Sequence, residues 1–387
     1  MLSRRVRGKP LSGAGEGAGF DVVVVGAGVV GLACAAAVAS AGRSVLVLES
    51  EPGIARGITS RNSEVVHAGI YYPADSLKTA LCIAGRRALY AWCEAKRVPH
   101  RRLGKLVVAT NAAEVGIVED LHRRALANGV EGLEWLDRAA IARLEPEVEA
   151  QVALHSTQTG IVDAHAFCQS LEAEAEAADA VVLFERRVEA LARRSYGWQI
   201  DVVDAEGKRE AIDAGCVVDA AGLAADRIAG LAGLDVDALG WRLHLCKGDY
   251  FGLAPGSRVR LSRLIYPVPQ QAGLGIHATL DLAGRVRFGP DTEYVAALDF
   301  DVDPGKAASF RDAAKRYLPG LAGAELVPDY AGIRPKLAGP GQGFRDFVIE
   351  EATPHGAPGF VACIGIESPG LTAALAIGER VAALVGS

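Results

Sequence analysis

Residues 20–49 read FDVVVVGAGVVGLACAAAVASAGRSVLVLE, and this stretch decides the fold. Its four consecutive valines, Val22 to Val25, are typical of a strand that is buried on both faces. Three spaced glycines follow, and the alanine-rich segment 32–41 then predicts a helix that ends at Gly42. Residues 44–48 predict a second strand, with Glu49 at its end. Because parallel strands need a crossover helix between them, this order predicts a parallel sheet covered by helices.

The three glycines predict a phosphate-binding turn. Gly26, Gly28 and Gly31 fit the pattern G-x-G-x-x-G directly after a strand and at the start of a helix. The first glycine permits a tight turn, the second lets the backbone approach a pyrophosphate, and the third lets the helix pack against the strand. Glu49 lies 23 residues after Gly26, close to the spacing expected for an acid that binds a ribose, and its charge disfavours a 2′-phosphate. The stretch therefore predicts a Rossmann-like site for FAD or NAD rather than NADP.

Residues 22–42 contain no charged side chain over 21 positions, which is also the length of a membrane span. The glycines divide this segment into a strand and a helix, so we predict no transmembrane segment. The composition, with 50% hydrophobic and 23% charged residues, is that of a globular protein. A formal net charge of −6 argues against a nucleic-acid partner, because phosphate neutralisation needs a basic surface.

Seven cysteines are scattered along the chain without a C-x-x-C pair, so we predict no metal site. Their number and spacing suit free thiols in a reducing compartment. Residues 1–19 are basic and rich in glycine and alanine, and they lack the apolar segment of a secretory signal. We predict that they form a disordered tail.

The remaining pattern predicts a second domain of a different kind. Between residues 241 and 292, short β segments at 248–253, 264–268, 273–280 and 285–289 are separated by proline and glycine, which indicates an antiparallel sheet. The expected fold class is mixed α/β, a Rossmann-like domain with an inserted antiparallel or mixed β-sheet domain. We assign residues 20–80, 150–240 and 330–387 to the dinucleotide domain, and residues 81–149 and 241–329 to the substrate domain.

Two later segments favour FAD over NAD. Residues 217–222, VVDAAG, resemble the second FAD-contacting strand of two-domain flavoproteins. Residues 365–372, GIESPGLT, precede the last predicted helix, and Pro369 and Gly370 bring the N-terminus of that helix close to a ligand. The positive end of a helix dipole there would stabilise an anionic reduced flavin.

Several segments together resemble the L-2-hydroxyglutarate dehydrogenase family, which belongs to the D-amino-acid-oxidase-like flavoproteins. They are the glycine turn, TSRNSEVVHAGIYY at 59–72, KTALC at 78–82, KGDYF at 247–251, YAGIRPK at 330–336 and SPG at 368–370. The resemblance covers nearly all of the chain after Phe20. It implies FAD, an L-2-hydroxy acid substrate, and electron transfer to a quinone or another non-oxygen acceptor.

The fingerprint and the resemblance together predict the residues that contact the cofactor. They are Gly26, Gly28, Val29, Val30, Gly31, Glu49, Ser50, Thr59, Ser60, Asn62, Ser63, His67, Val188, Ala220, Ala221, Gly222, Gly332, Arg334, Pro369, Gly370, Leu371 and Thr372.

Oxidation of a 2-hydroxy acid requires a cation that binds the carboxylate. We predict Arg334, whose guanidinium can bind a carboxylate through two hydrogen bonds. Pro335 favours an extended backbone at Arg334, which places Lys336 on the same face. Two cations on one face suit a dicarboxylate such as 2-hydroxyglutarate.

The reaction also requires a base for the hydroxyl proton, and histidine is the usual choice near neutral pH. His67, in the long loop after the second strand, and His277, in the segment 273–280, are both candidates, and the sequence does not decide between them. Tyr266 and Tyr71 are candidate hydroxyl donors.

The resulting hypothesis is FAD-dependent oxidation of L-2-hydroxyglutarate, or a related L-2-hydroxy acid, to the 2-oxo acid by hydride transfer to flavin N5. One alternative is an amine or amino-acid oxidase of the same fold, similar to glycine or sarcosine oxidase. Another is a non-catalytic dinucleotide-binding protein. We expect a cytoplasmic location, or a mitochondrial one in a eukaryote, with peripheral membrane contact where a quinone accepts the electrons.

Overall fold

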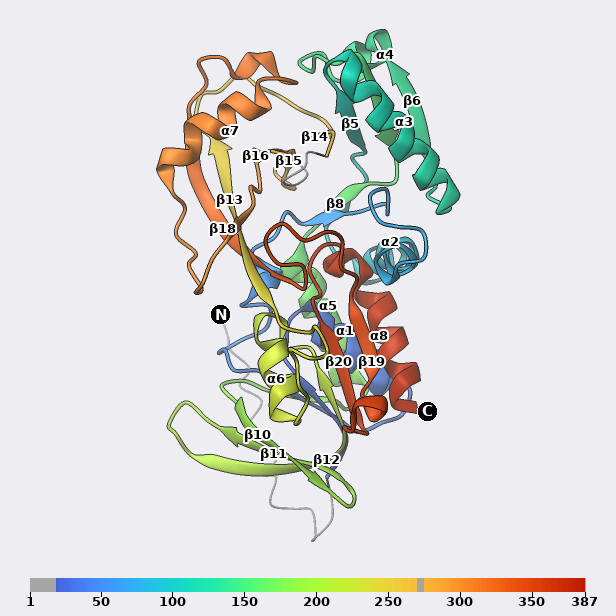
Figure 1. Ribbon diagram of the computed structural model, residues 1–387, viewed down its shortest axis with the longest axis vertical. Coiled ribbons are helices and arrows are strands. Elements are labelled where there is room, and N and C mark those ends of the chain that lie inside the picture. The colour runs from blue at the N-terminus through green and yellow to red at the C-terminus, as the bar shows by residue number, and fades with distance from the viewer. Residues whose placement is uncertain (1–18, 270–274, 387) are drawn as a thin grey trace.

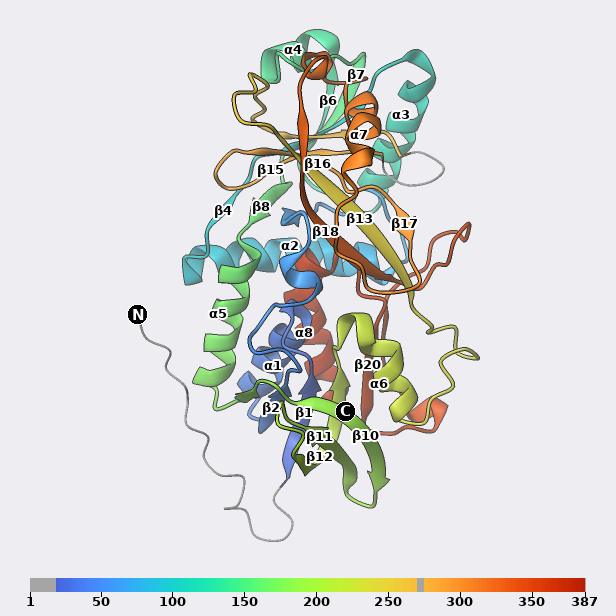
Figure 2. The same cartoon turned by 90° about the vertical axis from the view of Figure 1, so that its left-hand side faces the viewer.

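The computed structural model describes residues 19–269 and 275–386, so the predicted tail lies almost entirely outside the described residues. Two orthogonal views show a lower part built around one sheet and an upper part built around another (Figure 1, Figure 2). The long strands β13 and β18 run from one part to the other (Figure 1). The fold class predicted from the sequence is confirmed.

The lower sheet has the strand order β10-β11-β12-β1-β2-β9, and β20 and then β19 attach beside β12. Strands β9, β2, β1, β12 and β20 are parallel to their neighbours in this series, whereas β10, β11 and the first half of β12 form an antiparallel meander. The strands are β1 (Phe20–Val25), β2 (Val45–Leu48), β9 (Val181–Leu183), β10 (Arg187–Arg194), β11 (Gly197–Val203), β12 (Arg209–Asp219), β19 (Val348–Glu351) and β20 (Phe360–Ile364).

The valines of β1 are buried on both sides of this sheet. Val22 and Val24 pack against α1 (Val29–Ser40), α5 (Ala164–Ala177) and α8 (Gly370–Gly386). Val23 and Val25 point to the opposite face, where the meander and α6 (Ala225–Leu231) cover them. A strand covered on both faces selects an uninterrupted apolar run, which is why the sequence signal was strong here.

Helix α1 begins three residues earlier than predicted, at Val29, because Gly28 takes an extended conformation and serves as its N-cap. The apolar spacing that marks a helix starts only at Leu32, so the first turn was missed. The other helices are α2 (Leu77–Lys96), α3 (Ala112–Ala127), α4 (Arg138–Leu144) and α7 (Ala307–Ala314). Short 3-10 turns occur at Ile58–Ser60, Gly222–Ala224, Pro304–Lys306, Pro319–Leu321 and Thr353–His355.

The upper sheet is mixed, with the order β17-β13-β16-β15-β14-β5-β7-β6 and with β18 beside β13. Its one parallel contact in the described chain joins β14 to β5, and the other pairs are antiparallel. Its strands are β5 (Lys105–Ala109), β6 (Leu133–Asp137), β7 (Val152–Ser156), β13 (His244–Leu253), β14 (Leu264–Pro267), β15 (Ala278–Leu280), β16 (Val286–Phe288), β17 (Glu293–Tyr294) and β18 (Leu326–Lys336). A third, small sheet joins β3 (Val65–Val66), β8 (Gly160–Val162) and β4 (His100–Arg101).

The pairing places some segments differently from the expected domain division. Strand β7 lies after residue 150 but pairs with β5 and β6 in the upper sheet. Helix α2, which lies mostly after residue 80, packs against α8 of the lower part, where a Cβ on Gly85 would lie 2.4 Å from the Thr372 carbonyl oxygen. The division into a dinucleotide domain and a substrate domain remains our proposal, with these two elements exchanged.

In the part of the chain that the structure describes, no helix is both long and apolar enough to cross a membrane. The seven cysteines are all free thiols, six of them buried and Cys216 half-buried.

Candidate functional site

The glycine turn between β1 and α1 leaves no room for side chains. Gly26 has a φ of +106°, which L-residues rarely adopt, and a Cβ there would lie 2.6 Å from the Ala220 carbonyl oxygen. A Cβ on Gly31 would lie 1.9 Å from the carbonyl oxygen of Gly26. The first and third glycines of the predicted fingerprint are therefore required by backbone packing.

The second glycine faces the start of α1. The Val29 N–H donates to the Thr59 hydroxyl at 3.1 Å, and a Cβ on Gly28 would meet the same hydroxyl at 3.2 Å. Gly28 provides no side-chain cap. The first turn of α1, including Val30, thus offers its backbone N–H groups beside a buried threonine, which is the arrangement that a pyrophosphate needs.

Glu49 lies across the carboxyl end of β2, beside the glycine turn. One carboxylate oxygen accepts from the Ala27 N–H at 2.7 Å. The other accepts from the Glu51 N–H at 2.9 Å and from the Ser50 hydroxyl at 3.2 Å. Each carboxylate oxygen can accept further hydrogen bonds, so a ribose with free hydroxyls fits here and a 2′-phosphate does not.

The end of β12 meets the same turn, as predicted. The Ala220 N–H donates to the Val25 carbonyl at 3.0 Å, and Ala221 and Gly222 follow at the sheet edge. Val188, in β10, is buried, and its carbonyl accepts from Arg227 at 3.3 Å. The donor set around the turn therefore fits a dinucleotide held at the carboxyl ends of β1, β2 and β12.

Asp219, the last residue of β12, is a fully buried carboxyl group behind this turn. Its Oδ1 accepts from the Ala221 N–H at 3.1 Å, and its Oδ2 has no partner in the described structure. Burial raises the pKa of Asp219 well above its usual value, and the nearby Asp226 adds to the shift. The protonated form is therefore favoured in the folded state.

This shift predicts that replacing Asp219 with asparagine will stabilise the protein at alkaline pH. The stabilising contribution of the Asp219 proton is fully present below the unfolded-state pKa near 4 and is lost as pH rises towards the folded-state pKa. Asparagine keeps the acceptor for Ala221 and carries no charge, so we expect its Tm to exceed that of the wild type by roughly 2–4 °C at pH 8, or roughly 1 kcal/mol. The difference should shrink at pH 5. An equal difference at both pH values, measured by calorimetry of the holoenzyme, would contradict the assignment.

The N-terminus of α8 lies beside the loop that follows β2. The Thr372 hydroxyl accepts from the His67 N–H at 2.9 Å and donates to the Val65 carbonyl at 3.2 Å. Pro369 precedes the helix, whose first residues, Gly370 and Leu371, are buried and half-buried. His67 and Thr372, which the sequence predicted separately as site residues, are thus brought together although they lie 305 positions apart.

Residues 59–63 of this loop lie against β13 and β18. The Asn62 side chain donates to the Thr59 carbonyl at 2.6 Å, and the Ser63 hydroxyl lies 2.8 Å from the Tyr250 hydroxyl. The Ser60 hydroxyl donates within its own turn. A Cβ on Gly332 would lie 2.1 Å from the Arg61 carbonyl oxygen, so only glycine permits this approach.

His67 is half-buried, and its Nε2 lies 3.3 Å from the Ser368 hydroxyl. Burial, with the Lys105 ammonium nearby, lowers the pKa of His67 to about 3. The imidazole is therefore neutral at physiological pH.

His277 lies directly before β15, not inside a strand as predicted, and it is buried. Its ring stacks on that of Tyr266 with centroids 3.5 Å apart and an angle of 10° between the planes. Burial raises the pKa of the Tyr266 hydroxyl well above its usual value. Both predicted residues lie in the upper part of the molecule, one against the other.

Sequence reasoning missed Lys105, the first residue of β5, which is 1% exposed. Its ammonium lies 4.6 Å from the ring centroids of both Tyr266 and Tyr71. Lysine is seldom fully buried, and nothing in the local sequence GKLVVA marked this one.

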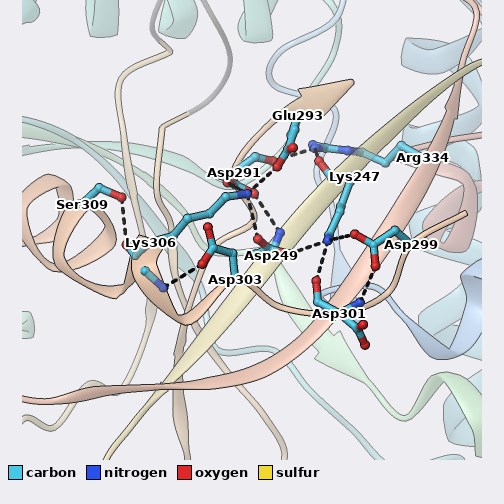
Figure 3. Close-up of polar contacts among 11 residues, drawn as sticks. Lys247, Asp249, Asp291, Glu293, Asp299, Asp301, Asp303, Lys306, Ser309 and Arg334 are labelled. Atoms are coloured by element: carbon cyan, nitrogen blue, oxygen red, sulfur yellow. Dashed lines mark hydrogen bonds and ion pairs between the residues drawn. The ribbon is translucent and has the colours of Figure 1, made fainter. Parts of the chain in front are cut away.

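Arg334 and Lys336, the predicted anchors, point to the same face of β18 and are both half-buried. The Arg334 guanidinium donates to the Cys246 carbonyl at 3.3 Å. It also donates to the carbonyls of Lys247 and Asp291 at 3.1 and 2.6 Å (Figure 3). Lys336 pairs with Glu367 at 3.2 Å, and Lys78 pairs with the same carboxylate at 3.0 Å. Burial alone would raise the pKa of Glu367, but these two ammonium groups lower it.

An acidic cluster lies beside Arg334 (Figure 3). Carboxylate oxygens of Asp249, Asp291 and Glu293 are within 4.8 Å of one another, close enough to share a cation. The Lys306 ammonium lies among them at 2.8, 2.9 and 2.6 Å, so a lysine already supplies the balancing charge.

Comparisons with known proteins agree with this geometry. A family model described as DAO, FAD dependent oxidoreductase, matches residues 21–384. The mitochondrial L-2-hydroxyglutarate dehydrogenase of Arabidopsis thaliana is 39% identical over 94% of this chain and 82% of that protein. The L-2-hydroxyglutarate dehydrogenase of an Escherichia coli strain is 27% identical over 95% and 93% of the two chains.

Solved structures share the whole fold. The FAD-bound L-α-glycerophosphate oxidase of Mycoplasma pneumoniae superposes with a TM-score of 0.83 at 26% identity, over 95% of each chain. Glycine oxidase of Geobacillus kaustophilus, at a TM-score of 0.77 and 22% identity over 95% and 94% of the chains, shows the fold alone. FAD, which residues 217–222 and 365–372 predicted, is confirmed as the cofactor. The chain belongs to the DAO family of FAD-dependent oxidoreductases, and L-2-hydroxyglutarate dehydrogenases are among its relatives.

Proposed function

We propose that this enzyme oxidises L-2-hydroxyglutarate, or a closely related L-2-hydroxy acid, to the 2-oxo acid. The observation that carries the proposal is the contact of a neutral histidine with the N-terminus of α8, close in sequence to Glu367, on which Lys78 and Lys336 converge. His67 contacts Thr372 through its backbone and faces Ser368 through its ring. The relatives that match along most of the chain are dehydrogenases of this substrate.

In this proposal the protein binds the substrate carboxylate and removes the hydroxyl proton. Arg334 keeps a guanidinium nitrogen beyond its three carbonyl contacts, through which it can bind a carboxylate. His67, unprotonated near pH 7, accepts the hydroxyl proton at Nε2. A bound FAD would supply the acceptor for the hydride that leaves C2 of the substrate.

Electron transfer onward to a quinone or another non-oxygen acceptor is part of the same proposal. So is a location in the cytoplasm, or in the mitochondrion for a eukaryotic source, with peripheral membrane contact to reach a quinone. These statements rest on the chemistry of the family and on the mitochondrial relatives.

Anaerobic reduction of the bound FAD tests the substrate. L-2-Hydroxyglutarate should bleach the flavin absorbance stoichiometrically in the absence of oxygen, whereas its D-enantiomer, glycine, sarcosine and glycerol 3-phosphate should not. Bleaching by glycine or sarcosine with release of hydrogen peroxide in air would favour an amine oxidase. No bleaching by any compound of this panel would contradict the proposed substrate.

A further inference from the structure

Lys105 lies on the face of β5 that is turned towards the site. Side chains alternate along a strand, so Lys105 shares its face with Val107 and Ala109. These two residues pack against Ala68 and Ile70, which directly follow His67. The Lys105 ammonium therefore projects towards the loop that carries His67 and Tyr71.

The surroundings of this ammonium contain aromatic faces and no carboxylate. Tyr71 and Tyr266 lie on either side at 4.6 Å, a distance at which a ring attracts a cation. Within the described residues, no ion pair or hydrogen bond to the Lys105 ammonium is found. The Tyr71 hydroxyl is also buried without a partner. The Lys105 ammonium thus has two aromatic contacts and no paired anion, and one of the two rings carries a hydroxyl without a partner.

In the described part of the chain, the other two buried lysines are paired with acids. Lys78 contacts Glu367 at 3.0 Å, and Lys247 contacts Asp299 at 2.7 Å. Lys336, the anchor predicted from sequence, contacts Glu367 at 3.2 Å. Lys78 and Lys336 share the Glu367 carboxylate, so the Lys336 ammonium already has an anionic partner, whereas the Lys105 ammonium has none among the described residues.

An unpaired buried ammonium is costly to the folded protein, and burial lowers the pKa of Lys105 to about 7. Such a cost is recovered when an anion enters the site and pairs with the ammonium. Tyr71 can donate its unpaired hydroxyl to the same anion.

We propose that Lys105 binds the second carboxylate of a dicarboxylate substrate, while Arg334 binds the carboxylate next to the reacting carbon. This inference rests on the proposed function for the identity of the substrate. It assigns the preference for a dicarboxylate to a residue of the upper sheet and not to Lys336.

Calorimetric titration with glutarate and butyrate tests the inference without turnover, because neither acid carries a hydroxyl group to oxidise. The wild-type holoenzyme should bind glutarate more tightly than butyrate. In Lys105→Met the affinity for glutarate should fall by about 10- to 100-fold, the range of one charge-assisted hydrogen bond, while the affinity for butyrate stays within about 3-fold. The matched variant Lys336→Met should keep most of the preference for glutarate.

The same variants are then compared in anaerobic reduction by L-2-hydroxyglutarate and L-2-hydroxybutyrate. Lys105→Met should lower the ratio of the two kcat/KM values by about 10- to 100-fold. Its FAD content should match that of the wild type, and its Tm should be equal or higher, because an unpaired buried charge has been removed. These two readouts separate a binding role from loss of folding.

Preserved preference for glutarate in Lys105→Met, equal losses for both acids, or no preference in the wild type would each overturn the inference. Loss of the preference in Lys336→Met alone would return the role to Lys336. If the wild type binds glutarate through Lys105 but L-2-hydroxyglutarate does not reduce it, the inference stands and the proposed function fails.

Discussion

Replacing His67 with asparagine is expected to slow the reduction of bound FAD by L-2-hydroxyglutarate by about 10²- to 10⁴-fold, the range that a positioned general base contributes. Asparagine preserves the backbone contact to Thr372 and a polar group near Ser368, but it accepts no proton. Stopped-flow measurement at saturating substrate isolates the chemical step. The dissociation constant of the substrate, taken from the concentration dependence, should change much less.

The variant His277→Asn tests the other candidate base. His277 is packed under the Tyr266 ring, so its loss should affect binding and stability more than the rate of reduction. Since the pKa of His67 is about 3, wild-type reduction should not decline between pH 8 and pH 5 as it would with an ordinary histidine base. A larger rate loss in His277→Asn than in His67→Asn would exchange the two roles.

Gly31→Ala is expected to abolish FAD binding and to destabilise the lower domain. The new Cβ would lie 1.9 Å from the Gly26 carbonyl oxygen, and a backbone atom cannot move aside without opening the turn between β1 and α1. A cost above about 4 kcal/mol is expected, as for other severe core clashes. The ratio of flavin to protein absorbance after purification and the Tm report the two effects.

Gly116→Ala provides the matched control. Gly116 also lies inside a helix, α3, but nothing stands within 4 Å of a Cβ at that position. Alanine there should raise stability by about 1 kcal/mol, because it has the higher helix propensity. A Gly31→Ala protein that purifies with a full complement of FAD would show that the turn is more adaptable than its packing indicates.

The sequence predicted best those elements whose pattern is set by local geometry. The valine strand of β1 was predicted correctly, since burial on both faces demands a continuous apolar run. The start of α1 was wrong because its first turn contacts the cofactor site and carries no periodic signal.

The candidate site was predicted less completely, because its contacts join distant parts of the chain. Lys105 contacts Tyr71, which lies 34 positions before it, and Tyr266, which lies 161 positions after it. The carboxylate that Lys336 shares with Lys78 is brought to it by the way β18 meets the N-terminus of α8. Residue type and spacing identified candidates for each role, but only the tertiary fold shows which charges balance one another.

The long antiparallel pair of β13 and β18 has a mechanical consequence. It is paired from His244 and Lys336 at one end to Leu253 and Leu326 at the other, and it enters both parts of the molecule (Figure 1). A domain hinge needs a few loop residues that absorb large changes in φ and ψ. Here the two parts are connected by two paired strands, whose hydrogen bonds resist such changes. We therefore expect the two parts to move as one rigid body, so that substrate enters and product leaves through local displacement of surface loops.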